Sequence, residues 1–124
     1  MRVLYVEDDP ITQSAMIRRL HPMGHEVTVF DNSNDAMGFL DLNEPELLLT
    51  DYDLGESPNG LSLADYARKH YSHCAIILIS SHDPRDLITK AKTQQIVVDD
   101  FIKKPVSGDG LAAHIEPAIK LRRA

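Results

Sequence analysis

The chain of 124 residues is 43% hydrophobic and 26% charged, as expected for one folded domain with its own core, and its formal net charge of −6 argues against binding nucleic acid. No apolar run approaches the roughly 20 residues that span a membrane, and the start of the chain turns acidic too soon for a secretory signal. We therefore expect residues 1–124 to form a single cytoplasmic domain that contacts neither membranes nor nucleic acid.

The first predicted strand is the apolar run Val3–Val6. A helix is predicted next, because Asp9 can cap its N-terminus, Pro10 suits its first position and Gly24 stops it. The apolar run Val27–Phe30 then predicts a second strand.

The second predicted helix, Ala36–Leu42, has the weakest signals of the five. Gly38 lowers the helix propensity inside it, and the preceding stretch Asp31–Asp35 is polar and rich in turn residues. The third strand is predicted at Leu47–Leu49.

A third helix is predicted to begin at Asn59 and Gly60, because the apolar residues that follow share one helical face. These residues are Leu61, Ala64, Ala67 and Tyr71. The run Ala75–Ile79 predicts the fourth strand, and Asp83 followed by a proline predicts the start of the fourth helix.

The last predicted strand is the short run Phe101–Ile102, after which Ser107 can cap a final helix. The apolar face of that helix consists of Leu111, Ile115, Ala118 and Ile119. Pro117 removes a backbone donor inside the helix, which predicts a kink or an early end near Glu116.

Strands and helices thus alternate five times along the chain, with short connections. This alternation predicts an α/β fold in which a doubly wound parallel sheet carries helices on both faces. In such a sheet, ligands bind beyond the carboxyl ends of the strands, where the strand order reverses.

Polar side chains end four of the five predicted strands. The first is followed by Glu7, Asp8 and Asp9, the third by Asp51, the fourth by Ser80 and Ser81, and the fifth by Lys103, Lys104 and Pro105. A lone Asp51 could simply be a turn residue. Because the strand ends meet at one edge of the sheet, we instead expect these groups to gather around Asp51.

The chemistry of such a cluster points to phosphate. Carboxylates that lie close together raise one another's pKa unless a cation compensates them, and Mg²⁺ takes a few carboxylate oxygens while keeping positions for water or phosphate. An Asp carboxylate can attack phosphorus, and the transfer also needs an ammonium group and a hydroxyl. Asp51, Lys104 and Ser80 can supply these three groups.

The ordered motifs of the chain resemble the receiver domains of bacterial two-component response regulators. The motifs are RVLYVEDDP, LLLTDYDL, IILISS and DDFIKKP, in the family's order and approximate spacing. The resemblance implies a flavodoxin-like fold with strand order 2-1-3-4-5. It also implies a switch rather than an enzyme, one that undergoes only Mg²⁺-dependent self-phosphorylation and autodephosphorylation.

The partners that the resemblance implies are a phosphohistidine donor and a downstream effector. The donor would be a sensor histidine kinase or a histidine phosphotransfer protein. A homodimer stays open, because a bend at Pro117 would alter the helix surface on which dimers of the common type form.

By the same resemblance, Asp51 is the phosphoacceptor. Mg²⁺, for which Mn²⁺ can substitute, would be bound by Glu7, Asp8, Asp51 and the backbone carbonyl of Asp53. Asp8 is expected to be the direct ligand and Glu7 to act through water, while Asp9 is the helix cap.

The groups expected to contact or sense the phosphoryl group are the hydroxyl of Ser80, the ammonium of Lys104 and the switch aromatic Phe101. Ser81 follows Ser80 in a position where a smaller residue is common in the family. The resemblance also implies a cis bond between Lys104 and Pro105.

The loop after Asp51 departs from the family pattern, because it has Gly55 where a proline is usual and is one residue longer. Asp53 and His82 occupy positions that the family uses to tune the lifetime of the phosphorylated state. We therefore expect these two side chains to control how fast water removes the phosphoryl group.

The sequence also fits two alternative functions. The segment Asp51-Tyr52-Asp53-Leu54 mimics the DxDx motif of haloacid-dehalogenase-type aspartyl phosphatases, although the acidic pair here comes first and no cap domain fits within 124 residues. The second alternative is a docking module that has the receiver fold but is not phosphorylated.

Overall fold

The computed structural model describes residues 1–123 and contains a parallel five-stranded sheet in the order β2-β1-β3-β4-β5. The strands are β1 (Arg2–Val6), β2 (Glu26–Phe30), β3 (Leu47–Asp51), β4 (Ala75–Ser80) and β5 (Asp100–Lys103). Each predicted strand lies within an observed one, and the expected α/β flavodoxin-like fold with its strand order is confirmed.

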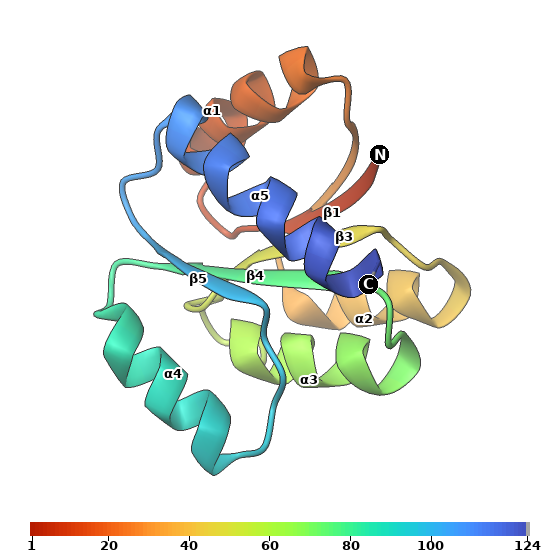
Figure 1. The fold of residues 1–124 in the computed structure, drawn as a ribbon, viewed down its shortest axis with the longest axis vertical. Helices are drawn as coiled ribbons and strands as arrows, with labels where there is room; N and C mark the ends of the chain where they lie inside the picture. The colour runs from red at the N-terminus through yellow and green to blue at the C-terminus, as the bar shows by residue number, and fades with distance from the viewer. Residues whose placement is uncertain (124) are drawn as a thin grey trace.

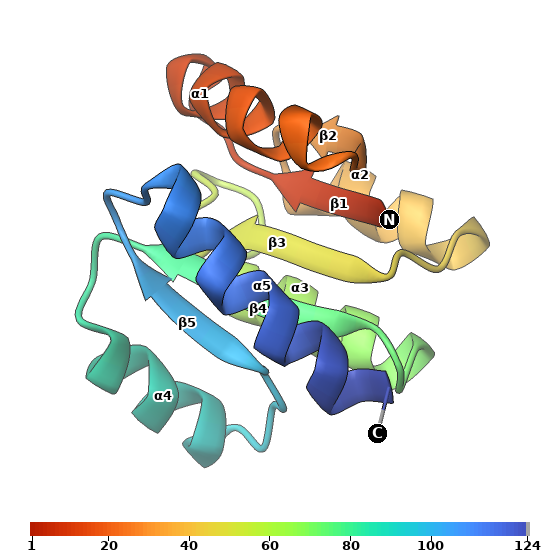
Figure 2. The same ribbon diagram turned by 45° about the horizontal axis from the view of Figure 1, so that its top comes forward.

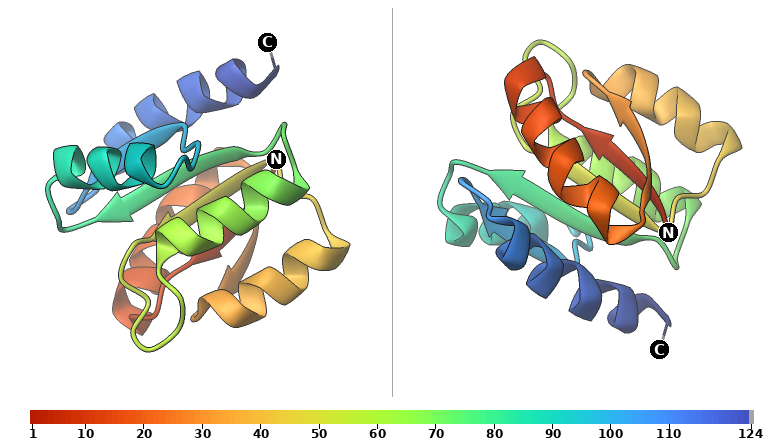
Figure 3. Two further views of the ribbon diagram at one scale, coloured as in Figure 1. Left: turned by 90° about the horizontal axis from the view of Figure 1, so that it is seen from below. Right: turned by 90° about the horizontal axis from the view of Figure 1, so that it is seen from above.

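Five α-helices cover the two faces of this sheet. They are α1 (Pro10–Leu20), α2 (Ser33–Leu42), α3 (Gly60–His70), α4 (Pro84–Thr93) and α5 (Gly108–Arg123), and a short 3-10 helix, η1 (His21–Met23), extends α1. Helices α1 and α5 lie on one face, and α2, α3 and α4 lie on the other (Figures 1 and 3). None of the helices in this described part combines the length and apolar character that crossing a bilayer demands.

The predicted helix starts and stops follow from local hydrogen bonding. The side chains of Asp9, Asn59 and Asp83 each accept a hydrogen bond from a backbone N–H of the helix that follows. At the other end of the α1–η1 segment, Gly24 adopts a left-handed conformation with φ of 83°, which glycine tolerates without steric cost.

The predicted start of α2 at Ala36 is wrong, because the helix begins at Ser33. The side chain of Asn32 caps it by accepting a hydrogen bond from the backbone N–H of Asp35 at 2.8 Å. Polar residues that resemble a turn in the sequence therefore form the first turn of this helix.

The predicted early end of the last helix is also wrong, because α5 continues past Pro117 to Arg123 (Figure 2). Pro117 is exposed, so a carbonyl group that loses its partner there can bond to water. The opposite side of the helix is buried against the sheet through Leu111, Ile115, Ala118 and Ile119, as the sequence predicts.

The register of the sheet brings the strand ends level with one another. Val6 pairs with Thr50, Asp51 with Ile79, and Ser80 with Lys103. Strands β3 and β4 are buried along their whole length, and each buried Leu or Ile side chain contributes about 1.5–3 kcal/mol. A rigid core thus holds the residues at the carboxyl edge of the sheet.

Candidate functional site

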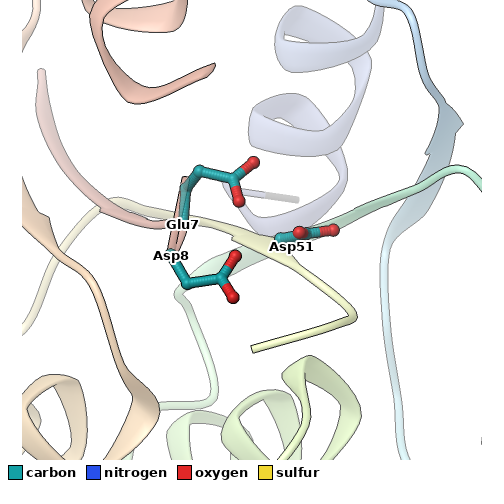
Figure 4. Close-up of side chains that lie close together, drawn as sticks. All are labelled: Glu7, Asp8 and Asp51. Carbon is teal, nitrogen blue, oxygen red and sulfur yellow. The ribbon is translucent and has the colours of Figure 1, made fainter. Parts of the chain in front are cut away.

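Three carboxylates meet at the carboxyl edge of the sheet, as predicted. Glu7 and Asp8 follow β1, Asp51 ends β3, and their closest oxygens all lie within 4.8 Å of one another (Figure 4). Glu7 and Asp51 are buried, with 1% and 6% of their surfaces exposed, whereas Asp8 is exposed. The cluster is therefore open to solvent on the side of Asp8.

Lys104 supplies the cation of this cluster. Its Nζ donates to Glu7 Oε1 at 2.8 Å and to Asp51 Oδ2 at 3.1 Å. The backbone N–H of Lys104 donates to the carbonyl of Ser80 at 2.8 Å. The pairing of β4 with β5 therefore fixes the position of the Lys104 backbone, from which its side chain extends to the carboxylates. The predicted cis bond between Lys104 and Pro105 is confirmed.

The charges of the cluster do not balance, because three carboxylates face one ammonium group. Burial raises the pKa of Glu7, and the charge of Asp51 adds to this effect although the hydrogen bond from Lys104 opposes it. Burial and the neighbouring Glu7 likewise raise the pKa of Asp8. For Lys104, burial alone would lower the pKa, but the hydrogen bond to Glu7 and the two nearby carboxylates outweigh it, and the pKa is raised.

This donor set fits a small divalent cation. All three candidate ligands present oxygen atoms, which Mg²⁺ prefers, and the excess negative charge would be relieved by a dication. The exposed Asp8 leaves an open side for water or phosphate oxygens.

The residues expected to sense a phosphoryl group lie on β4, on β5 or directly after β4. Ser80 is 1% exposed at the end of β4, and its Oγ accepts a hydrogen bond from the backbone N–H of His82 at 3.0 Å. Ser81 is exposed. Phe101 on β5 is half-buried and packs against the apolar cluster between α3 and α4 that includes Leu78.

The two residues expected to tune the lifetime are in contact with each other. His82 Nε2 lies 3.0 Å from Asp53 Oδ2, and both side chains are more than half exposed. The rings of His82 and Tyr52 form a T-shaped pair, with 5.7 Å between their centroids and 83° between their planes. The hydroxyl of Tyr52 accepts a hydrogen bond from Lys90 of α4 at 3.2 Å, so the residue after Asp51 contacts both the β4–α4 loop and α4.

A groove of about 370 Å³ opens beside the cluster, between α1 and the segment that follows β5. Its lining includes Asp51 and Lys104 together with Ile11 of α1 and Val106. Ile11 is 81% exposed, which is unusual for a large apolar side chain next to a charged site. A partner that reaches Asp51 from this side would contact apolar side chains such as Ile11 and Val106.

The sequence did not reveal two residues that set the position of Asp51. The Thr50 hydroxyl donates to the carbonyl of Asp51 at 3.0 Å, and Gly60 packs so closely that a Cβ atom there would lie 2.1 Å from that carbonyl oxygen. The sequence pattern indicates Gly60 only as part of a helix start. A glycine at the first position of a helix, where serine or proline would serve, was the available signal of a close backbone approach.

Comparisons with known proteins agree with this architecture. A cyclic di-GMP phosphodiesterase of Thermotoga maritima is 30% identical over 123 residues, covering 98% of this chain and 32% of that protein. The sensory transduction protein BceR of Halalkalibacterium halodurans is 28% identical over 120 residues, covering 96% of this chain and 50% of that protein. The chain therefore spans half or less of the length of these relatives.

A solved structure bears on the fold of the chain, and a family model bears on its family. The N-terminal domain of a response regulator/sensory box/GGDEF 3-domain protein from Carboxydothermus hydrogenoformans has a TM-score of 0.88 at 19% identity, covering 99% of this chain and 97% of that chain, which supports the fold. The family model described as response regulator receiver domain matches residues 3–116. Its match to nearly the whole sheet, including the strand ends that carry Glu7, Asp51 and Lys104, shows that the chain belongs to the response regulator receiver domain family.

Proposed function

We propose that residues 1–124 act as one receiver domain in which Asp51 accepts a phosphoryl group from a phosphohistidine of a sensor histidine kinase or a histidine phosphotransfer protein. The observation that carries this proposal is the environment of Asp51, a buried carboxylate held 3.1 Å from the Lys104 ammonium and beside two further carboxylates. The exposed Ile11 and the groove beside it support docking of the donor on the α1 side.

The transfer breaks one bond to phosphorus and forms another. A carboxylate oxygen of Asp51 attacks phosphorus while the bond from phosphorus to the imidazole nitrogen of the donor breaks, and the electron pair of that bond leaves with the imidazole, which takes up a proton. Lys104 stabilises the charge that spreads over the phosphoryl oxygens. The backbone of β3 and the packing of Gly60 against it hold Asp51 in position for the attack.

Mg²⁺ is the cofactor we assign to the site, with Mn²⁺ as a substitute. Glu7, Asp8, Asp51 and the backbone carbonyl of Asp53 would hold it, and it would neutralise charge on the transferred group. The acidic side chains also keep other anions away from the site until a cation is bound.

The output follows from movement of Ser80 and Phe101. After phosphorylation, the Ser80 hydroxyl would donate to a phosphoryl oxygen and give up its bond with the backbone N–H of His82. The half-buried Phe101 would then turn inward and change the surface formed by α4, β5 and α5. An effector that distinguishes the two packings shifts their populations.

Incubation of the purified protein with Mg²⁺ and phosphoramidate tests the proposal. Intact-mass spectrometry should detect the addition of one phosphoryl group to the wild-type protein and none to Asp51→Asn, while a chelator should prevent the labelling. An unlabelled wild-type protein would favour the docking-module alternative. Rapid turnover of p-nitrophenyl phosphate would instead favour the aspartyl phosphatase.

We expect that breaking the contact between Asp53 and His82 changes the lifetime of the phosphorylated state. The pair joins the loop that follows Asp51 to the loop that follows Ser80, and we expect it to limit the access of water to Asp51, so His82→Ala should shorten the lifetime several-fold. Asp53→Asn should also change the lifetime, because it removes the charge but leaves a group that can bond to His82. Dephosphorylation followed after removal of the donor measures both, and unchanged lifetimes in both variants would reject the idea.

A further inference from the structure

A backbone hydrogen bond joins the two ends of the loop between β3 and α3, residues 52–59. The N–H of Gly60, the first residue of α3, donates to the carbonyl of Tyr52, the first residue of the loop, at 2.8 Å. Leu54 anchors the middle of the loop, because its side chain is 3% exposed and packs in the core with α2 and α3. Between these anchors the loop contains Asp53, whose carbonyl we assign to the metal.

A second helix also holds this loop, through two serines. The Ser33 hydroxyl donates to the carbonyl of Pro58 at 2.6 Å, and the backbone N–H of Ser33 donates to Ser57 Oγ at 3.3 Å. The Ser57 hydroxyl in turn donates to the carbonyl of Leu54 at 2.7 Å. A continuous chain of hydrogen bonds thus runs from the first turn of α2 to the residue next to Asp53.

The burial of Ser33 sets it apart from other polar residues. Judged by the exposure of the whole residue, the buried polar or charged residues within residues 1–123 are Glu7, Ser33, Thr50, Asp51 and Ser80. Four of these lie on or next to the strand ends that form the acidic cluster. Ser33 lies on α2, yet its hydroxyl donates to the loop that passes the same cluster. A buried hydroxyl is retained at a position like this only where its hydrogen bond is made.

The turn of this loop lies close to Asp8. Its turn at Gly55 has a positive φ of 64°, and a Cβ atom placed there would lie 3.5 Å from Asp8 Oδ2. The loop therefore packs its backbone directly against a candidate metal ligand. A shift of the loop would move both the carbonyl of Asp53 and the surroundings of Asp8.

We infer that Ser33 and Ser57 are positioning residues for the metal site, which hold the β3–α3 loop so that the Asp53 carbonyl faces the cation. This inference rests on the proposed function. Neither serine is one of the expected ligands, and both would act through the backbone of Leu54 and Pro58, to whose carbonyls their hydroxyls donate. Groups that orient metal ligands typically change metal affinity by 10–100-fold when removed, and we expect about tenfold weaker Mg²⁺ binding for each variant.

The experiment compares Ser33→Ala and Ser57→Ala with the wild-type protein and with Tyr71→Phe. The control also deletes a hydroxyl that donates to a backbone carbonyl of α2, but it does so at Leu40, at the other end of that helix. Calorimetric titration with MgCl₂ alone measures binding to the unphosphorylated protein. Hydrogen–deuterium exchange of the metal-free protein measures protection of residues 52–59. Ser57 is only half-buried, so its variant remains informative if Ser33→Ala does not fold.

Weaker Mg²⁺ binding together with faster exchange of the loop in the serine variants, and wild-type behaviour of Tyr71→Phe, would support the inference. Unchanged affinity in both serine variants would overturn it, and so would weaker binding without faster loop exchange. In either of those cases, phosphorylation of the wild-type protein on Asp51 would leave the proposed function intact. A wild-type protein that neither binds Mg²⁺ nor becomes phosphorylated would overturn the proposed function and this inference with it.

Discussion

Replacing Asp99 with alanine is expected to lower the free energy of unfolding by about 3–5 kcal/mol. The Asp99 side chain is fully buried and accepts hydrogen bonds from Arg68 Nη2 at 2.8 Å, from Arg122 Nε at 2.6 Å and from the backbone N–H of Ile76 at 2.8 Å. Burial lowers the pKa of Arg68, which shows that its environment already disfavours the charge. Without Asp99, two largely buried guanidinium groups would repel each other with no counter-charge.

Urea unfolding measures this change as a lower midpoint at an unchanged slope. The matched control is Asp65→Ala, which breaks an exposed pair with Lys69 (2.9 Å) on one helix and should change the stability by less than about 0.5 kcal/mol. Replacing Asp99 with leucine and both arginines with methionine should recover only part of the loss. The apolar cluster needs no counter-charge, but the backbone N–H of Ile76 and the carbonyl of Cys74 lose their partners. A loss below about 1 kcal/mol for Asp99→Ala would contradict the expected strength of the network.

Gly60→Ala is expected to destabilise the protein by roughly 3 kcal/mol, although alanine is the better helix former. A Cβ atom at this position would lie 2.1 Å from the carbonyl oxygen of Asp51 and 2.9 Å from Cδ1 of Leu78. The first of these atoms belongs to the backbone of a buried strand and cannot turn aside. The helix or the strand must therefore shift, and phosphorylation of Asp51 should slow together with the loss of stability.

Gly38→Ala is the matched control, because Gly38 also lies in a helix but nothing lies within 4 Å of a Cβ atom placed there. This substitution should stabilise the protein by about 0.5–1 kcal/mol. Thermal or urea unfolding of the two variants would show opposite signs. Equal effects at both positions would mean that α3 can move away from β3 without loss.

The fold could be predicted from the sequence because its signals are local. Apolar runs such as Ala75–Ile79 mark strands buried on both faces, and pairs such as Asp83-Pro84 mark helix starts. The start of α2 was harder to predict, although its signal is also local. Asn32 caps the helix by accepting a hydrogen bond from the backbone N–H of Asp35, but such short polar residues fit a turn equally well.

The residues of the candidate site that lie at the ends of strands could be predicted from the sequence. Glu7, Asp51 and Lys104 come together because parallel strands end at one edge, which the order of the motifs already implies. The ionic network around Asp99 was not predictable. It lies near the start of β4, at Ile76, whereas the candidate site lies at the other end of that strand. The partners of Asp99, Arg68 and Arg122, are 31 and 23 residues away, and the adjacent Asp99 and Asp100 look alike in the sequence although only Asp99 is paired with both arginines.

The position of Tyr52 gives the protein a natural optical reporter. The chain has no tryptophan, so its ultraviolet fluorescence comes from four tyrosines without energy transfer to an indole. Tyr52 directly follows Asp51, and its phenol contacts Lys90 at 3.2 Å and the ring of His82. A rearrangement that breaks either contact is therefore expected to change the quenching of this ring, which tyrosine fluorescence of the unlabelled protein would detect.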